Sequence, residues 1–127
     1  MNNFNILVVD DDSDIRYAIS NILRKCDCYV EEAESIETAF GMLQTQSYNV
    51  VFSDMRFHGD LGGEDLLEHV KQHYPGIDVV LVSCAMDGQQ RSDLISKGAA
   101  CCLQKPFFRD TCLTVLGKLG QNMQKAA

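Results

Sequence analysis

The apolar residues of this chain switch repeatedly between two spacings, and that alternation restricts the fold more than any other feature. Short apolar runs rich in Val and Ile predict five buried strands, at residues 4–9, 28–32, 49–53, 77–83 and 100–104. Helical spacing follows each run and predicts five helices, within residues 15–23, 36–43, 66–70, 87–95 and 107–121. Alternating strands and helices imply a parallel sheet with helices on both faces, so we expect a doubly wound α/β domain.

Polar residues and glycine mark several helix ends. Ser13 or Asp14 is expected to cap the first helix, and Ser35 the second. Asp87 begins a D-x-x-Q capping box before the fourth helix, and Gly98 stands where that helix should stop.

Length and charge narrow the classes of protein to consider. The 127 residues suit one domain, which we assign to residues 1–122, with 123–127 as a tail or the start of a linker. A net charge of −7 disfavours direct binding to nucleic acid or to an anionic membrane surface. No apolar run reaches the roughly 18 residues of a membrane span, and the N-terminus lacks the basic segment of a signal peptide. We therefore expect a cytoplasmic protein.

The cysteines support the same compartment. No pair has C-x-x-C or zinc-ligand spacing, and without a secretory signal the thiols should stay reduced. We therefore expect six free, mostly buried thiols, at Cys26, Cys28, Cys84, Cys101, Cys102 and Cys112.

Charged and polar side chains follow four of the five predicted strands. In a doubly wound sheet the carboxyl ends of the strands lie at one edge, where such folds bind ligands. The residues placed there are Asp10, Asp11 and Asp12 after the first strand, Asp54 after the third, Ser83 at the fourth and Lys105 after the fifth.

The residues at this edge predict a phosphoryl-transfer site that uses a cation. Two carboxylates about 4 Å apart repel by about 4 kcal/mol at an effective dielectric of about 20, so a cation, a proton or nearby basic side chains must offset them. Oxygen ligands with few Cys or His nearby suit Mg²⁺, which leaves room for a phosphate. Asp54 is then the candidate nucleophile, Lys105 offsets charge on the transferred group and Ser83 donates a hydrogen bond to it. Taken alone, the acidic run after the first strand fits helix capping equally well.

Four segments together resemble a response-regulator receiver domain. They are ILVVDDD at 6–12, VVFSDM at 50–55, VVLVSCA at 79–85 and LQKPF at 103–107, in the order typical of that family. The resemblance covers almost the whole chain. It implies a flavodoxin-like three-layer (βα)5 sandwich with sheet order 2-1-3-4-5.

The resemblance also implies roles for the acidic residues. Asp54 would be phosphorylated by a sensor histidine kinase, a phosphotransfer protein or a small acyl phosphate. Asp11 and Asp54 would ligate Mg²⁺ directly, the backbone carbonyl of Arg56 would be a further ligand, and Asp10 would act through water. Such a domain catalyses its own phosphorylation and dephosphorylation without being a dedicated enzyme.

Signalling would start from Ser83, which contacts the phosphoryl group, while Lys105 pairs with a phosphoryl oxygen. The partner surface would comprise the fourth helix, the fifth strand and the fifth helix. Two residues depart from the family pattern: Cys102 occupies the place of an aromatic switch residue, and His58 stands where proline is common. We expect phosphorylation to be retained and the switching readout to differ.

Other functions and partners stay open at this stage. A haloacid-dehalogenase-like phosphohydrolase would use Asp10 as nucleophile within a D-x-D motif, and a pseudo-receiver would bind partners without phosphorylation. An output domain C-terminal to this chain and a homodimer linked to phosphorylation are both compatible with the sequence. His69 and His73 have the i, i+4 spacing of a metal pair, which we disfavour because no third ligand is evident.

Overall fold

The computed structural model describes residues 4–126, with side chains described through Leu119. Strands and helices alternate along the chain as the apolar pattern predicts. Their bounds are β1 (Asn5–Val9), α1 (Ser13–Arg24), β2 (Tyr29–Ala33), α2 (Ile36–Thr45), β3 (Val50–Asp54), α3 (Gly63–His73), β4 (Asp78–Ser83), α4 (Gly88–Ser96), β5 (Cys101–Gln104) and α5 (Arg109–Ala126).

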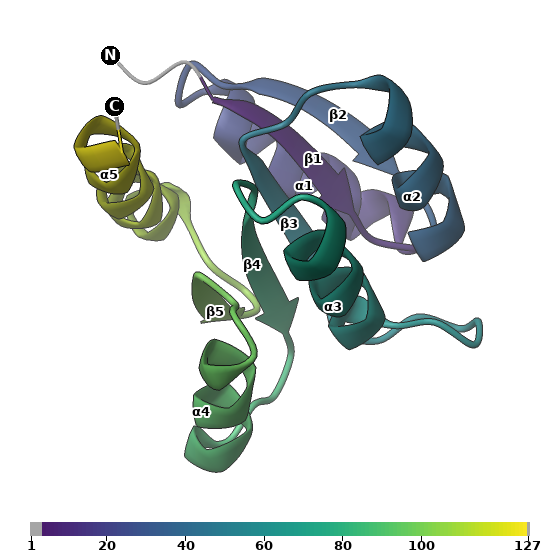
Figure 1. Cartoon of the computed structure of the whole chain (residues 1–127). Helices are drawn as coiled ribbons and strands as arrows, with labels where there is room; N and C mark the ends of the chain where they lie inside the picture. Colours follow the sequence, from purple (N-terminus) through teal and green to yellow (C-terminus); the bar gives the residue numbers. More distant parts are fainter. Residues whose placement is uncertain (1–3, 127) are drawn as a thin grey trace.

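All five strands pair in parallel, in the order β2-β1-β3-β4-β5. The chain passes from β1 outward to β2 and then returns to β3 on the other side of β1 (Figure 1). The expected fold and strand order are therefore confirmed. The order reverses between β1 and β3, which is where a doubly wound sheet leaves a crevice at the carboxyl ends of its strands.

Helices cover both faces of the sheet, and each face has its own apolar core. Ile6 and Val8 of β1 pack with residues of α1 and α5, whereas Leu7 and Val9 pack with residues of α2, α3 and α4. Because both faces are buried, the central strands are continuous apolar runs that do not alternate with polar residues. The two layers of helices hold the strand ends of the sheet in fixed positions.

The first helix begins differently from the prediction. Asp12, rather than Ser13 or Asp14, is the N-cap, and its Oδ1 accepts hydrogen bonds from the amides of Asp14 at 2.9 Å and Ile15 at 3.1 Å. The physical reason is that Asp12 lies one residue outside the helix, where a short carboxylate reaches the free N–H groups of the first turn. The prediction for Ser35 is confirmed, since its hydroxyl accepts from the amide of the third residue beyond it.

The start of α4 follows the sequence signal in part. The Asp87 carboxylate accepts a hydrogen bond from the Gln90 amide at 2.7 Å, which is one half of the expected capping box, and the return bond to the Gln90 side chain is not formed among the described residues. Gly98 has a φ of 110°, a conformation that side chains rarely adopt.

The last helix starts later and ends later than the apolar pattern indicates. It begins at Arg109 rather than Phe107, and it continues through Ala126, past the expected end near Gln121. The residues after Gln121 carry no apolar periodicity, so the pattern cannot mark them as helical. Among the described residues, no helix combines the length and apolar character needed to cross a bilayer.

Candidate functional site

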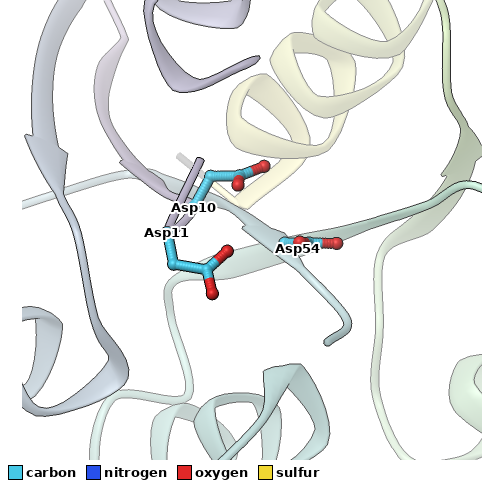
Figure 2. A group of neighbouring side chains, drawn as sticks. All are labelled: Asp10, Asp11 and Asp54. Carbon is cyan, nitrogen blue, oxygen red and sulfur yellow. The ribbon is translucent and has the colours of Figure 1, made fainter. Parts of the chain in front are cut away.

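Three aspartates converge at the switch point of the sheet. Asp10 and Asp11 follow β1, and Asp54 is the last residue of β3. Each offers a carboxylate oxygen within 4.8 Å of the other two, and the three side chains lie around one space in Figure 2. They line an open cavity of about 500 Å³. The acidic cluster that the sequence predicts is therefore formed.

Lys105, which follows β5, provides the local counter-charge. Its Nζ lies 3.1 Å from Oδ2 of Asp10 and 3.2 Å from Oδ1 of Asp54. The lysine side chain is only 11% exposed, so these contacts are shielded from solvent screening. One ammonium thus bridges two of the three carboxylates. The predicted role of Lys105, to offset charge on a transferred phosphoryl group, stays a prediction.

Burial and contacts shift the pKa values of this ion pair. Burial raises the pKa of Asp10, and the Asp12 amide and the Lys105 ammonium oppose that shift only in part. For Lys105, burial acts to lower the pKa, but the hydrogen bonds and charges of Asp10 and Asp54 outweigh it, so its pKa is raised. Lys105 therefore stays charged at neutral pH.

The buried Asp10 is held from two directions. Its Oδ1 accepts a hydrogen bond from the Asp12 amide at 2.9 Å, and Arg16 donates to its backbone carbonyl at 2.8 Å. Arg16 also pairs with Glu32 on β2. The sequence offered no signal for Arg16, because only the fold places this position of α1 beside the end of β1.

Asp54 is fixed by its neighbours in the β3–α3 region. Its Oδ1 accepts from the Met55 amide at 2.8 Å. Its backbone lies against Gly63 at the start of α3, where an added Cβ would overlap the Asp54 carbonyl oxygen. Glycine is required at Gly63 because no side chain fits this close approach.

Asp11 is the carboxylate of the triad nearest to His58. Its Oδ2 accepts a hydrogen bond from the His58 amide at 3.2 Å and lies 3.7 Å from the imidazole Nε2. The loop after Asp54 therefore folds back over the end of β1. His58 and Arg56 both line the cavity.

Ser83 reaches the cavity, but its hydroxyl bonds within its own loop. It donates to the Ala85 carbonyl at 2.9 Å and accepts from the Ala85 amide at 3.3 Å. A bound phosphoryl group would have to compete with these two bonds. The exposed Cys84 beside it also lines the cavity, which sequence reasoning missed because the residue looked like another core thiol.

Cys102 does not reach the cavity. It is 1% exposed and packs in the core beneath α2, α3 and α4. Its backbone carbonyl accepts a hydrogen bond of 2.7 Å from Arg91 of α4. The structure thus connects β5 to α4 through Arg91, a contact that the sequence did not indicate. A switch role for Cys102 stays a prediction.

The remaining cysteines and histidines form no second candidate site among the described residues. All six cysteines are free, with Cys28, Cys102 and Cys112 buried and only Cys84 exposed. The His69 ring packs at a tilt against Phe40, with ring centroids 4.2 Å apart, and against His73 at 4.6 Å. Within residues 4–126, the acidic triad is the one group of three or more side chains placed to share a metal ion.

The donor set of the triad fits a hard divalent cation. Carboxylate oxygens are the ligands that Mg²⁺ and Mn²⁺ prefer, and Mg²⁺ needs only one or two of them from the protein. Asp11 and Asp54 are half-buried beside open space, whereas Asp10 is buried; Lys105 pairs with both Asp10 and Asp54 and leaves Asp11 to the cation. The arrangement can therefore hold a cation and leave room for a phosphoryl group.

Comparison with known proteins gives the family. The family model for the response regulator receiver domain matches residues 6–116 of this chain, which include every residue of the site. The chain belongs to the response regulator receiver family.

Relatives of this receiver domain include DNA-binding transcriptional regulators and other response regulators. The DNA-binding transcriptional regulator NtrC of Proteus hauseri is 29% identical over 112 residues, covering 88% of this chain and 24% of the relative. Among solved structures, the receiver domain of NtrX from Brucella abortus is 29% identical with a TM-score of 0.84, covering 91% of this chain and 97% of that one. The chain spans about a quarter of the length of the curated relatives that it matches.

Family membership also decides between a receiver domain and a haloacid-dehalogenase-like phosphohydrolase. A phosphohydrolase that uses Asp10 as nucleophile would require this side chain to be accessible to its substrate, but in this receiver Asp10 is 1% exposed, whereas Asp54 is half-buried. Asp12, the second residue of the D-x-D motif, caps α1. A receiver domain is not a classical enzyme, and this one has the acidic pocket of a phospho-accepting member.

Proposed function

We propose that this receiver accepts a phosphoryl group on Asp54, with Mg²⁺ held by Asp11, Asp54 and the backbone carbonyl of Arg56, and with Asp10 acting through water. The observation that carries the proposal is the contact of Lys105 with Asp54, 3.2 Å apart, inside an acidic pocket. The same ammonium also contacts Asp10, so it offsets the clustered carboxylates as a group. At Asp54 it is in addition placed to pair with the negatively charged phosphoryl oxygens that phosphorylation adds beside that carboxylate.

The reaction uses one carboxylate oxygen of Asp54 as the nucleophile. This oxygen forms a bond to phosphorus, while the bond between phosphorus and the donor atom breaks and its electron pair leaves with the donor. The donor atom is a histidine nitrogen of a kinase or phosphotransfer protein, or the oxygen of a small acyl phosphate. A bound Mg²⁺ supplies charge neutralisation for the phosphoryl oxygens.

Two further side chains stabilise the product in this proposal. Lys105 keeps its ammonium within hydrogen-bond reach of Asp54 and pairs with a phosphoryl oxygen. Ser83 exchanges its bond to the Ala85 carbonyl for a bond to the phosphoryl group. That exchange releases the loop after β4, which is the start of the conformational signal.

The surface beside the pocket suits a helical phosphodonor. An apolar groove runs between α1 and the segment after β5, lined by Ile15, Ala18, Ile19, Ile22, Pro106 and Phe107, with Cys84 and Lys105 at its end. Ile15, Cys84 and Lys105 also line the acidic cavity, so the groove and the cavity are continuous. We infer that a donor helix that carries the phosphorylated histidine lies in this groove, because the groove opens onto the cavity that contains Asp54.

The wider role follows from the relatives and is also proposed. Residues 1–122 act as the receiver of a cytoplasmic two-component system, and an output module C-terminal to it responds through α4, β5 and α5, with Cys102 in the switch position. The curated relatives are about four times longer than the matched segment, which supports an attached output module. A phosphorylation-linked homodimer is one form that the response can take.

The function is tested by labelling with radioactive acetyl phosphate. We expect label to enter the wild type in Mg²⁺ and not in excess chelator, and Asp54→Asn to abolish it. Asp10→Asn is the comparison, since a phosphohydrolase would lose its intermediate there instead. Label that persists in Asp54→Asn, or that needs no divalent cation, contradicts the proposal, and a wild type that never labels is a pseudo-receiver.

A further inference from the structure

The histidine beside the acidic triad takes no part in the proposed phosphoryl transfer. His58 lies in the loop between β3 and α3, four residues after Asp54, and lines the same cavity. Its amide donates to Oδ2 of Asp11, and its ring Nε2 lies 3.7 Å from that same oxygen. Among the residues that line the cavity, His58 offers the one nitrogen with a lone pair, because the nitrogens of Arg56 and Lys105 are cationic donors.

The distance is within a small rotation of that between two ligands of one cation. Two donor atoms each about 2.1 Å from an octahedral cation lie about 3.0 Å apart when adjacent. The separation of 3.7 Å between the His58 nitrogen and the Asp11 oxygen exceeds this value by about 0.7 Å, so the ring must turn toward Asp11 before both atoms can bind one cation. The imidazole is fully exposed, at 101%, so its ring can rotate about its side-chain bonds without breaking any packing.

The hydrogen bond of the His58 amide keeps the imidazole close to Asp11 while the ring rotates. The hydrogen bond from the His58 amide to Asp11 anchors the loop at 3.2 Å, so the imidazole is tethered next to a carboxylate that faces the cavity. A ring on a freely moving loop would lose more conformational entropy when it bound a metal. The tether leaves only the side-chain rotation to be fixed.

We propose that His58 is a ligand of the cation in this site, and that its nitrogen shifts the preference of the site from Mg²⁺ toward a transition-metal dication such as Mn²⁺, Fe²⁺ or Co²⁺. The inference rests on the proposed cation site, which it deepens. Purely oxygen-lined sites suit Mg²⁺, whereas an imidazole nitrogen favours transition metals. His58 would occupy a position that water would otherwise take, leaving the phosphoryl position free.

Affinities measured by titration calorimetry give the first test. Co²⁺ and Mg²⁺ are titrated separately into the wild type, His58→Ala and the matched control His73→Ala, which removes an exposed imidazole from α3. We expect His58→Ala to weaken Co²⁺ binding at least tenfold, roughly the lower limit for losing even an outer partner of a metal ligand. Mg²⁺ binding should change less than twofold, and His73→Ala should match the wild type for both ions.

Pulsed EPR of bound Mn²⁺ gives a readout independent of phosphorylation. We expect a coupling to ¹⁴N in the wild type, its replacement by a ¹⁵N pattern in protein made with ¹⁵N-histidine, and its loss in His58→Ala. A loss of Co²⁺ affinity in His73→Ala or in Cys84→Ser, with His58→Ala unchanged, overturns the proposal because it assigns the ligand to another side chain.

The failure of this inference is distinguishable from the failure of the proposed function. A wild type that binds Mg²⁺ and is phosphorylated on Asp54, yet shows no ¹⁴N coupling and an unchanged preference for Co²⁺ in His58→Ala, overturns the role of His58 alone. A wild type that binds neither cation overturns both.

Discussion

Replacing Lys105 by methionine tests whether the ammonium is the internal counter-ion of the acidic pocket. Methionine keeps most of the length and the apolar stem of the side chain but removes its charge. Asp10 would then be left 1% exposed and next to the carboxylate of Asp54 with no cation between them. Every other contact of the site stays available to the variant.

The size of the effect follows from the two contacts of the lysine. At 3.1 Å and 3.2 Å, each ion pair is worth a gross attraction of about 5 kcal/mol at an effective dielectric of about 20. The cost of burying the ammonium cancels much of this sum, and removing one partner of a buried pair typically destabilises a protein by about 3–5 kcal/mol. We expect a loss of about 3 kcal/mol in the free energy of unfolding when no divalent cation is present.

Urea unfolding in chelator and in Mg²⁺ measures this loss. Lys97→Met is the matched control, because Lys97 pairs with Glu64 at 3.3 Å on the surface, where both side chains are about half exposed. Such exposed pairs contribute about 1 kcal/mol or less. Mg²⁺ should narrow the gap between Lys105→Met and the wild type, since a bound cation replaces the missing charge.

A double variant isolates the cause of the loss. Asp10→Asn combined with Lys105→Met removes the stranded charge and keeps an oxygen that can accept from the Asp12 amide, so it should be more stable than Lys105→Met alone. The reasoning is refuted if Lys105→Met unfolds within about 0.5 kcal/mol of the wild type in chelator, the usual range for a surface substitution. It is also refuted if the double variant is no more stable than the single one.

Three further predictions concern the rest of the molecule. Gly63→Ala should lower the free energy of unfolding by about 1–3 kcal/mol and reduce labelling of Asp54, because the new Cβ would overlap the Asp54 carbonyl oxygen. The control Gly41→Ala, on α2 where the new Cβ meets open space, should raise the free energy of unfolding by about 0.5–1 kcal/mol in the same urea assay. At pH 8 a thiol reagent should modify the exposed Cys84 long before Cys112, whose pKa burial raises to about 12, as peptide mass spectrometry can follow. Because the pKa of Lys105 is raised in the folded protein, its contribution to stability is complete below pH 10.5, the ordinary pKa of lysine, and is lost as the pH rises through the raised pKa. The difference in unfolding free energy between the wild type and Lys105→Met should therefore shrink only above pH 10.5. A difference that shrinks between about pH 8 and 10 contradicts this.

The fold could be predicted because its signals are local and repeated. Each central strand is buried on both faces, so its sequence is a continuous apolar run. Each helix has apolar residues at helical spacing, and a capping or turn residue lies at one of its ends. The boundaries were less accurate where several polar residues compete, as with Asp12 and Ser13 at the start of α1. The end of α5 lies in a polar segment that carries no periodicity to mark it.

The site could be predicted only as a set of strand ends. The sequence places Asp10, Asp54 and Lys105 after their strands, and parallel pairing then brings them to one edge. Contacts that join elements far apart in the chain leave no such mark. The bond from Arg91 to the Cys102 carbonyl and the approach of His58 to Asp11 depend on how loops and helices pack, which no local pattern encodes.

The most direct test of the central claim is to identify the residue that carries the phosphoryl group. Tritiated borohydride reduces an aspartyl phosphate to homoserine and releases phosphate, so it marks the acceptor after treatment with acetyl phosphate and Mg²⁺. Peptide mapping should then find tritium at position 54, in the peptide that contains VVFSDM. Tritium at position 10 instead, or at no aspartate, would contradict the assignment of Asp54 as the phosphoryl acceptor.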